Sequence, residues 1–166
     1  MEDVFLKIKD CIFELPKIND QNLYVLYMKT LTVSDDILVH CVTATSFPDG
    51  VQQAHETLHG MFPYDTDRNY FGISRPGKDG IIIYKAAAEE LNEGELAKYH
   101  LEIMIILKGD YLYIDIPGFS KDIPSIGATF QKLIIDQRIA ADGCCIEWYL
   151  HQNLCRCMVK INSSTH

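Results

Sequence analysis

Glu147 is the residue of this sequence best suited to chemistry, because it interrupts the apolar run CIEWYL. The composition of that run predicts a β-strand with Glu147 near its middle. A carboxylate buried in an apolar strand is costly unless it has a partner. That partner would be a base across a hairpin, such as Arg156 or Lys160, or a ligand held in a pocket.

A second candidate is the motif HETLH at residues 55–59. On a helix, His55 and His59 would share one face and Glu56 would activate a zinc-bound water, as in zinc peptidases. The continuation that supplies a third ligand is absent, and Gly60 directly follows the motif. Helical periodicity puts His55 at the margin of the apolar stripe and His59 toward solvent. The pattern therefore favours two histidines flanking the stripe of an exposed helix over a metal site.

Four of the six cysteines would meet across a tight turn near the C-terminus: Cys144, Cys145, Cys155 and Cys157. An adjacent pair followed by C-x-C differs from the C-x2-C pairs of zinc ribbons. In a protein of a reducing compartment, cysteines are mostly small buried apolar residues. We predict reduced core thiols, with metal binding as the weaker alternative, and no cofactor.

The composition limits the class of protein. At 166 residues, with 48% hydrophobic and 23% charged residues, the chain is expected to form one soluble domain over residues 1–162. The start MEDVFLKIKD lacks the apolar segment of a signal peptide, and no apolar run reaches membrane-spanning length. We therefore expect a cytoplasmic protein without membrane contact. The net charge of −8 argues against direct nucleic-acid binding and suits cationic ligands.

Two stretches of the chain repeat one order of elements, strand–helix–strand–strand. The first covers about residues 37–90 and the second about residues 100–161, which predicts an α+β fold built from duplicated βαββ units. Residues 1–36 are expected to add strand material to the sheet through CIFEL and LYVLYMKTL. Residues 163–166 are polar and are expected to form a frayed tail.

The two-residue period of β-strands predicts which side chains share a face. In the strand that begins at Asp110, alternate apolar residues are expected to lie under the helix, and in CIEWYL this position is assigned to Ile146 and Trp148. A carboxylate, a thiol and several phenols are then expected together on the other face: Glu147, Cys145, Tyr149, Tyr111 and Tyr113. Such a face is either wet surface or the wall of a pocket.

Two segments resemble a known family, the gyrase-inhibitor-like (GyrI-like) proteins. They are CIEWYL followed by CMVKI, and YFGISRPGKDGIIIYKAAAE, and the resemblance spans about residues 37–161. Its most specific element is the Glu-x-Tyr of Glu147 and Tyr149. The resemblance implies the fold of the effector-binding domains of AraC-type and multidrug-responsive regulators. In that fold a pseudo-twofold axis relates two βαββ units, and a ligand cleft lies between them.

The resemblance also implies a function. In effector-binding members, the glutamate that matches Glu147 faces the cleft and binds cationic, often aromatic, compounds. The leading expectation is therefore a stand-alone protein that binds a hydrophobic cation, with Glu147 as counter-charge and Tyr149, Tyr111, Tyr113 and Cys145 beside it. Such a protein would be a sensor related to transcription regulators.

Three alternatives remain open. The first is a hydrolase of the same fold that opens strained, electrophilic rings, in which Glu147 is the general base and Tyr149 or Tyr113 orients the water. The second is a regulator of an unknown protein partner, with the acidic surface as the interface. The third, which the sequence favours least, is the zinc peptidase built on His55, Glu56 and His59.

Overall fold

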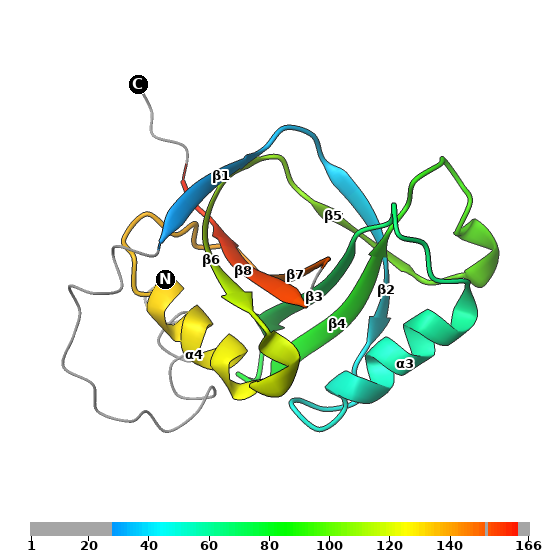
Figure 1. Ribbon diagram of the computed structural model, residues 1–166, viewed down its shortest axis with the longest axis horizontal. Helices are drawn as coiled ribbons and strands as arrows, with labels where there is room; N and C mark the ends of the chain where they lie inside the picture. The colour runs from blue at the N-terminus through cyan, green and yellow to red at the C-terminus, as the bar shows by residue number, and fades with distance from the viewer. Residues whose placement is uncertain (1–27, 152, 163–166) are drawn as a thin grey trace.

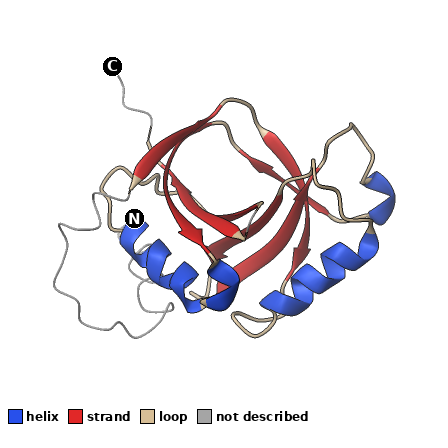
Figure 2. Ribbon diagram, in the orientation of Figure 1, coloured by secondary structure: helices blue, strands red, loops and turns tan. Residues whose placement is uncertain are grey.

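A single eight-stranded antiparallel sheet forms the body of the protein (Figures 1 and 2). The computed structural model describes residues 28–151 and 153–162. The sheet has the order β1-β6-β8-β7-β3-β4-β2-β5 and curls into a half-barrel, with α3 and α4 on its outer face. The strands are β1 (Lys29–Val33), β2 (Ile37–Thr43), β3 (Tyr70–Pro76), β4 (Ile82–Glu89), β5 (Glu102–Ile106), β6 (Gly109–Pro117), β7 (Cys145–Leu150) and β8 (Leu154–Lys160). The helices are α3 (Val51–Met61) and α4 (Pro124–Leu133), with short 3-10 turns η1 (Ala97–Tyr99) and η2 (Phe119–Lys121).

The fold contains the predicted duplication. The first unit is β2-α3-β3-β4 and the second is β6-α4-β7-β8. Each unit places its last strand in the middle of its three strands, and the two units join through the antiparallel pair β3–β7. A pseudo-twofold axis therefore passes between β3 and β7, near the point where Gly72 lies opposite Glu147. The predicted α+β fold of duplicated βαββ units is confirmed.

The N-terminal strand prediction is only partly covered by the structure. CIFEL, the first part of LYVLYMKTL and the expected tail at residues 163–166 lie outside the described residues. The end of LYVLYMKTL lies in β1, which pairs with β6 in the register Lys29↔Tyr113. Across the described ranges, neither helix has the length and apolar character needed to cross a bilayer.

The core is divided between the two faces of the sheet. On the outer face, α4 packs over Leu112, Cys145 and Cys157, while α3 packs over the alanines of β4. The inside of the curl holds residues from strands at both edges and at the centre, including Val33, Ile106 and Met158, because the curl brings distant strands together. The five cysteines in the described part of the chain are free thiols, and all but one of them are buried.

The predicted faces of β7 are wrong with respect to the helices. Glu147 lies opposite Cys157, which lies opposite Ile114, so these three side chains share the helix-covered face. Ile146 and Trp148 lie inside the curl instead. Both faces of β7 are largely buried, so alternation alone cannot tell which face the helix covers. The carboxylate lies on the helix side because the space between α3 and α4 is a cavity rather than packed core.

Candidate functional site

A cavity of about 840 Å³ lies between α3 and α4, over the central strands of the sheet. Both units contribute to its wall: Phe47 and His55 come from the first, and Phe119 and Phe130 from the second. Phe47 and Phe119 each follow the first strand of their unit. The pseudo-twofold axis therefore runs into a cleft whose two sides are built from corresponding parts of the chain.

Glu147 lies in the wall of this cavity and is only 8% exposed. Its Oε2 accepts hydrogen bonds from the hydroxyls of Tyr149 and Tyr84, the latter at 3.1 Å. These two hydroxyls are themselves 3.1 Å apart. Within the described ranges, Glu147 forms no ion pair, and its Oε1 receives no hydrogen bond. The carboxylate is therefore desolvated and held by neutral donors rather than by a base.

The cross-strand ion pair considered for Glu147 does not form. Arg156 instead donates to both carboxylate oxygens of Asp115, at 2.8 and 3.0 Å. Its guanidinium also lies 4.2 Å from the centre of the Tyr113 ring. Arg156 pairs with Trp148 in the β7–β8 ladder, so it points to the face of the sheet opposite to Glu147.

Burial sets the protonation equilibria around the carboxylate. It raises the pKa of Glu147, while the hydrogen bonds from Tyr149 and Tyr84 partly offset this increase. Burial also raises the pKa of both tyrosines well above their usual value. The two phenols therefore stay protonated, and negative charge in this group resides on Glu147 alone.

Gly72 makes the arrangement sterically possible. It lies directly opposite Glu147 in the β3–β7 ladder. A Cβ at this position would be 2.0 Å from the Tyr84 hydroxyl oxygen and 2.9 Å from Oε2 of Glu147. Tyr84 belongs to the next strand, β4, and its ring reaches across the glycine to the carboxylate. Tyr84 is not among the site residues predicted from the sequence, and the small residue Gly72 in β3 is the signal that could have pointed to a large neighbouring side chain.

His55 extends the hydrogen-bonded group from α3. Its Nε2 is 2.9 Å from the Tyr84 hydroxyl, and its ring packs edge-on against Tyr149 with centroids 5.3 Å apart. A carboxylate only accepts hydrogen bonds, so Tyr84 donates to Glu147 and its oxygen accepts from Nε2–H of His55. Burial, and then the neighbouring His59, lowers the pKa of His55 to about 4. His55 is therefore neutral near pH 7.

The histidine motif contributes to the cavity wall. His55 and His59 stack with ring centroids 6.2 Å apart, and both line the cavity. Glu56 turns away and accepts a hydrogen bond from Gln52 at 2.8 Å. No group of three or more His, Cys, Asp or Glu side chains is arranged to hold a metal ion in the portion of the chain that the structure describes. Both histidines therefore contribute ring surface to the cavity wall, and His55 also hydrogen-bonds to Tyr84.

The five predicted ligand-binding residues lie in three different places. Glu147 and Tyr149 line the cavity. Cys145 shares their face of β7 but packs into the core under α4. Tyr111 and Tyr113 lie toward the inside of the curl, and the Tyr111 hydroxyl donates to the carbonyl of Leu107 at 2.6 Å. The expectation that these two tyrosines share a face with Glu147 is wrong, because the helix-side assignment of β7 was inverted.

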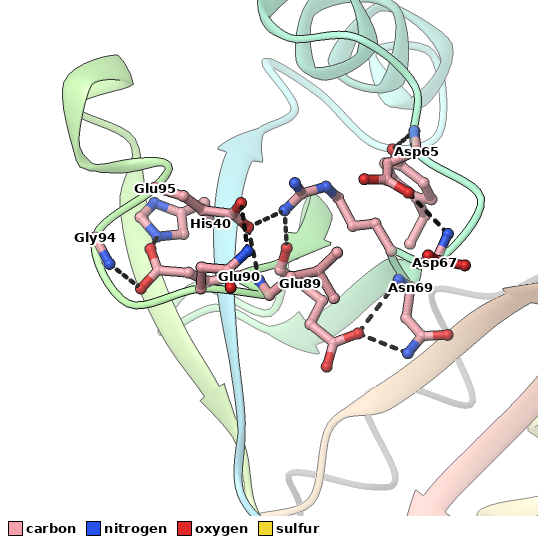
Figure 3. A network of polar contacts seen from close by, with 12 residues as sticks. His40, Asp65, Asp67, Asn69, Glu89, Glu90, Gly94 and Glu95 are labelled. Atoms are coloured by element: carbon pink, nitrogen blue, oxygen red, sulfur yellow. Dashed lines mark hydrogen bonds and ion pairs between the residues drawn. The ribbon is translucent and has the colours of Figure 1, made fainter.

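A polar network supports one end of the cavity (Figure 3). Arg68 lines the cavity and donates to Oε1 of Glu95 at 2.8 Å and to the backbone carbonyl of Glu89. The Arg68 hydrogen bond is the main cause that lowers the pKa of Glu95 to about 2. The positive charge of Arg68 is thus compensated locally. Glu147 is the other buried charged side chain of the wall, and no described residue compensates its charge in this way.

Asn69 links this network to β7. Its amide nitrogen donates to Oε2 of Glu89 at 2.6 Å (Figure 3). Its amide oxygen accepts from the indole nitrogen of Trp148 at 3.1 Å. Nearby, the buried His40 bonds to Glu90 at 2.6 Å. These contacts fix the beginning of β3 against the strand that carries Glu147.

Comparisons with known proteins identify the fold. No protein-family model and no curated protein matches the sequence. The integron cassette protein VCH_CASS2 of Vibrio cholerae has a similar structure, with a TM-score of 0.53 and 11% identity over 81% of this chain and 95% of that one. The structure of SAV2435 bound to tetraphenylphosphonium is also similar, with a TM-score of 0.55 and 12% identity over 82% of this chain and 94% of that one. At these identities the likeness establishes a shared fold.

Proposed function

We propose that this protein is a GyrI-like domain that binds a hydrophobic cation in its cavity, with Glu147 as the counter-charge. The observation that carries the proposal is a buried carboxylate in the wall of a cavity of about 840 Å³, and this carboxylate has no basic partner among residues 28–151 and 153–162. Leaving a charge buried and uncompensated costs several kcal/mol. A bound cation offsets that cost, and the attraction is strong because the Glu147 carboxylate is largely removed from water.

The aromatic wall suits the same class of ligand. Phe47 stacks near Tyr84 with centroids 6.0 Å apart, and Phe119 packs on Tyr149 at 5.4 Å. The pair of Phe47 and Tyr84 belongs to the first βαββ unit, and the pair of Phe119 and Tyr149 belongs to the second. Ring faces attract cations by about 0.5–2 kcal/mol each and also pack against the aromatic groups of a ligand. The cavity volume is within the range of about 300–1,000 Å³ that is typical of small-molecule sites.

The comparison with SAV2435 supports the ligand class. That protein is bound to tetraphenylphosphonium, a cation whose charge is enclosed by four phenyl rings. A ligand of this kind would satisfy both the buried carboxylate and the aromatic wall here. On this basis the protein is a small-molecule sensor related to the effector-binding domains of AraC-type and multidrug-responsive regulators.

Calorimetric titration with two ions of the same shape tests the proposal. Tetraphenylphosphonium should bind, and tetraphenylborate, its anionic counterpart, should not. Glu147→Gln should weaken tetraphenylphosphonium binding by at least about tenfold, or about 1.4 kcal/mol. Glu56→Gln, on the outer side of α3, is the matched control and should bind like the wild type. Equal binding of the two ions, or unchanged affinity in Glu147→Gln, contradicts the proposal.

The raised pKa of Glu147 also favours a second function, hydrolysis of a strained, electrophilic ring. Glu147 would take a proton from water while the water oxygen attacks a ring carbon. The ring bond to the leaving heteroatom would break, and that atom would be protonated through the Tyr149 hydroxyl. The test is turnover of an aryl epoxide to its diol. Turnover by the wild type that is lost in Glu147→Gln supports this alternative, and no turnover by the wild type excludes it for that substrate class.

A further inference from the structure

The edge strand β5 is unusually apolar for a free sheet edge. Among the described strands it pairs only with β2, so its other side carries no β-ladder. Its outward side chains are apolar and exposed: Ile103 by 56%, Ile105 by 51% and the following Leu107 by 47%. Free edges in native proteins usually carry lysine, proline or a bulge that prevents pairing with another chain. The stretch from Ile103 to Leu107 contains neither proline nor a charged residue.

The opposite edge of the sheet differs in this respect. β1, with the sequence KTLTV, exposes Lys29, Thr30 and Thr32. These polar side chains are typical of an edge that faces water. The exposed apolar surface is therefore a property of β5 and not of the sheet edges in general, and such a surface indicates an interaction site.

Charges at the two ends of β5 favour one particular partner. Glu102 begins the strand, where its half-exposed carboxylate already pairs with Lys85 of the same molecule, and the exposed Lys108 follows the strand end. Glu102 lies on the face of β5 opposite to Ile103 and Ile105, and Lys108 continues the chain two residues past the end of the strand. When two copies of this stretch pair antiparallel, Glu102 of each copy lies opposite Lys108 of the other copy. The acid and the base therefore meet at both ends of the pair. The stretch from Glu102 to Lys108 is thus complementary to itself.

We propose that β5 pairs antiparallel with β5 of a second molecule of this protein, about a twofold axis at Ile105. In this register, Ile105 faces Ile105 of the second molecule, Ile103 faces its Leu107, and Glu102 faces its Lys108. The apolar side chains are buried on one face and two ion pairs form on the other. The two half-barrels then share a continuous sheet, and the contact is closed, because each molecule uses the same surface.

This interface is independent of the ligand cavity. β2 and β4 separate β5 from β3 and β7, which carry Gly72 and Glu147. Loss of cation binding in a Glu147 variant therefore has no bearing on the dimer. Conversely, dimer-breaking variants on β5 should bind tetraphenylphosphonium like the wild type if that ligand binds at all.

Sedimentation velocity over a concentration series tests the dimer. The wild type should be a reversible dimer. Ile105→Lys places two lysines opposite each other on the axis and should raise the dissociation constant by at least about tenfold. The matched control is Ile135→Lys, because Ile135 follows α4 and is 52% exposed. This control should remain dimeric. A wild type that stays monomeric at high concentration, or a dimer that Ile105→Lys does not weaken, overturns the proposal.

Disulfide cross-linking tests the register. In antiparallel pairs, residues directly opposite each other have Cα atoms about 4.5–5.5 Å apart, a separation that a disulfide can bridge. Ile105→Cys should give a covalent dimer under mild oxidation. Ile103→Cys should not, because its two copies would be four residues apart along the strands, or about 13 Å. The double variant Ile103→Cys/Leu107→Cys should cross-link again. Equal cross-linking of the two single variants, or none above the wild-type background, contradicts the register.

Discussion

The Tyr84 hydroxyl occupies the space that a side chain on Gly72 would fill, since a Cβ there would lie 2.0 Å from its oxygen. Gly72 is also the cross-strand neighbour of Glu147. The glycine therefore allows a tyrosine from β4 to reach a carboxylate on β7, two strands away. Tyr149 already donates to the same carboxylate oxygen. Because Gly72 has no side chain, Glu147 accepts a hydrogen bond from a second phenol, that of Tyr84.

Gly72→Ala should displace Tyr84 from the carboxylate. Insertion of a methyl group into packed structure costs about 1–3 kcal/mol, so the free energy of unfolding measured in urea should fall by that amount. Near the pKa of Glu147, tetraphenylphosphonium affinity should fall as well, because the lost Tyr84 hydrogen bond favours the ionised carboxylate. The control is Gly60→Ala: nothing lies within 4 Å of a Cβ at that position of α3. Its stability should be unchanged or slightly higher. Equal free energies of unfolding in Gly72→Ala and Gly60→Ala would contradict this prediction, because they would show that Tyr84 moves aside without loss of stability.

Cation affinity should depend on pH through Glu147. Burial raises the pKa of this carboxyl group in the empty protein, and only the ionised form attracts a cation. Below that raised pKa, affinity should fall by about tenfold per pH unit, and above it affinity should be constant. Binding near the pKa should release a proton, which calorimetry detects as a dependence of the binding heat on the buffer. In Glu147→Gln both effects should disappear. A flat pH profile in the wild type would argue against a titrating carboxylate at the ligand.

His55 should contribute a loss of stability in acid. Its pKa is lowered from 6.5 to about 4 in the folded protein, so the unfolded chain binds a proton more readily between these values. The contribution is fully present above pH 6.5 and falls by about 3 kcal/mol as the pH decreases to 4. His55→Gln keeps a donor toward Tyr84 but does not titrate. The difference in unfolding free energy between wild type and variant should therefore shrink from pH 6.5 to 4. Parallel profiles would contradict the buried, neutral state of His55.

Two tyrosine variants distinguish a ligand bound in the cavity from a ligand bound inside the curl. Tyr149→Phe removes a hydroxyl that donates to Glu147 and stabilises its ionised form, so less of this carboxyl group is ionised near its pKa. Tetraphenylphosphonium affinity should fall there by about five- to tenfold. Tyr113→Phe removes a hydroxyl on the other face of the sheet, beside Arg156, and should leave affinity unchanged. Titration of both variants measures this contrast. A larger effect of Tyr113→Phe would mean that the ligand binds inside the curl.

Much of the fold could be predicted from local pattern. The repeated order of strands and helices established the duplicated βαββ units, because hydrophobic periodicity is a local property of the chain. Alternation also placed Glu147 and Tyr149 correctly on one face of β7. It could not identify the helix-covered face, because Trp148 and its neighbours on the other side are also largely buried. Tyr111 and Tyr113 were grouped with Glu147 for that reason alone.

The sequence by itself determined that a carboxylate and a phenol two residues apart would point the same way from an apolar strand. Only the tertiary structure decided what else would meet them. His55 comes from a helix 92 positions earlier in the chain and Tyr84 from a strand 63 positions earlier. Their approach depends on the β3–β7 register and on the empty volume at Gly72. The local hydrophobic period of the sequence encodes neither this register nor this volume, because both arise where the two units pack together.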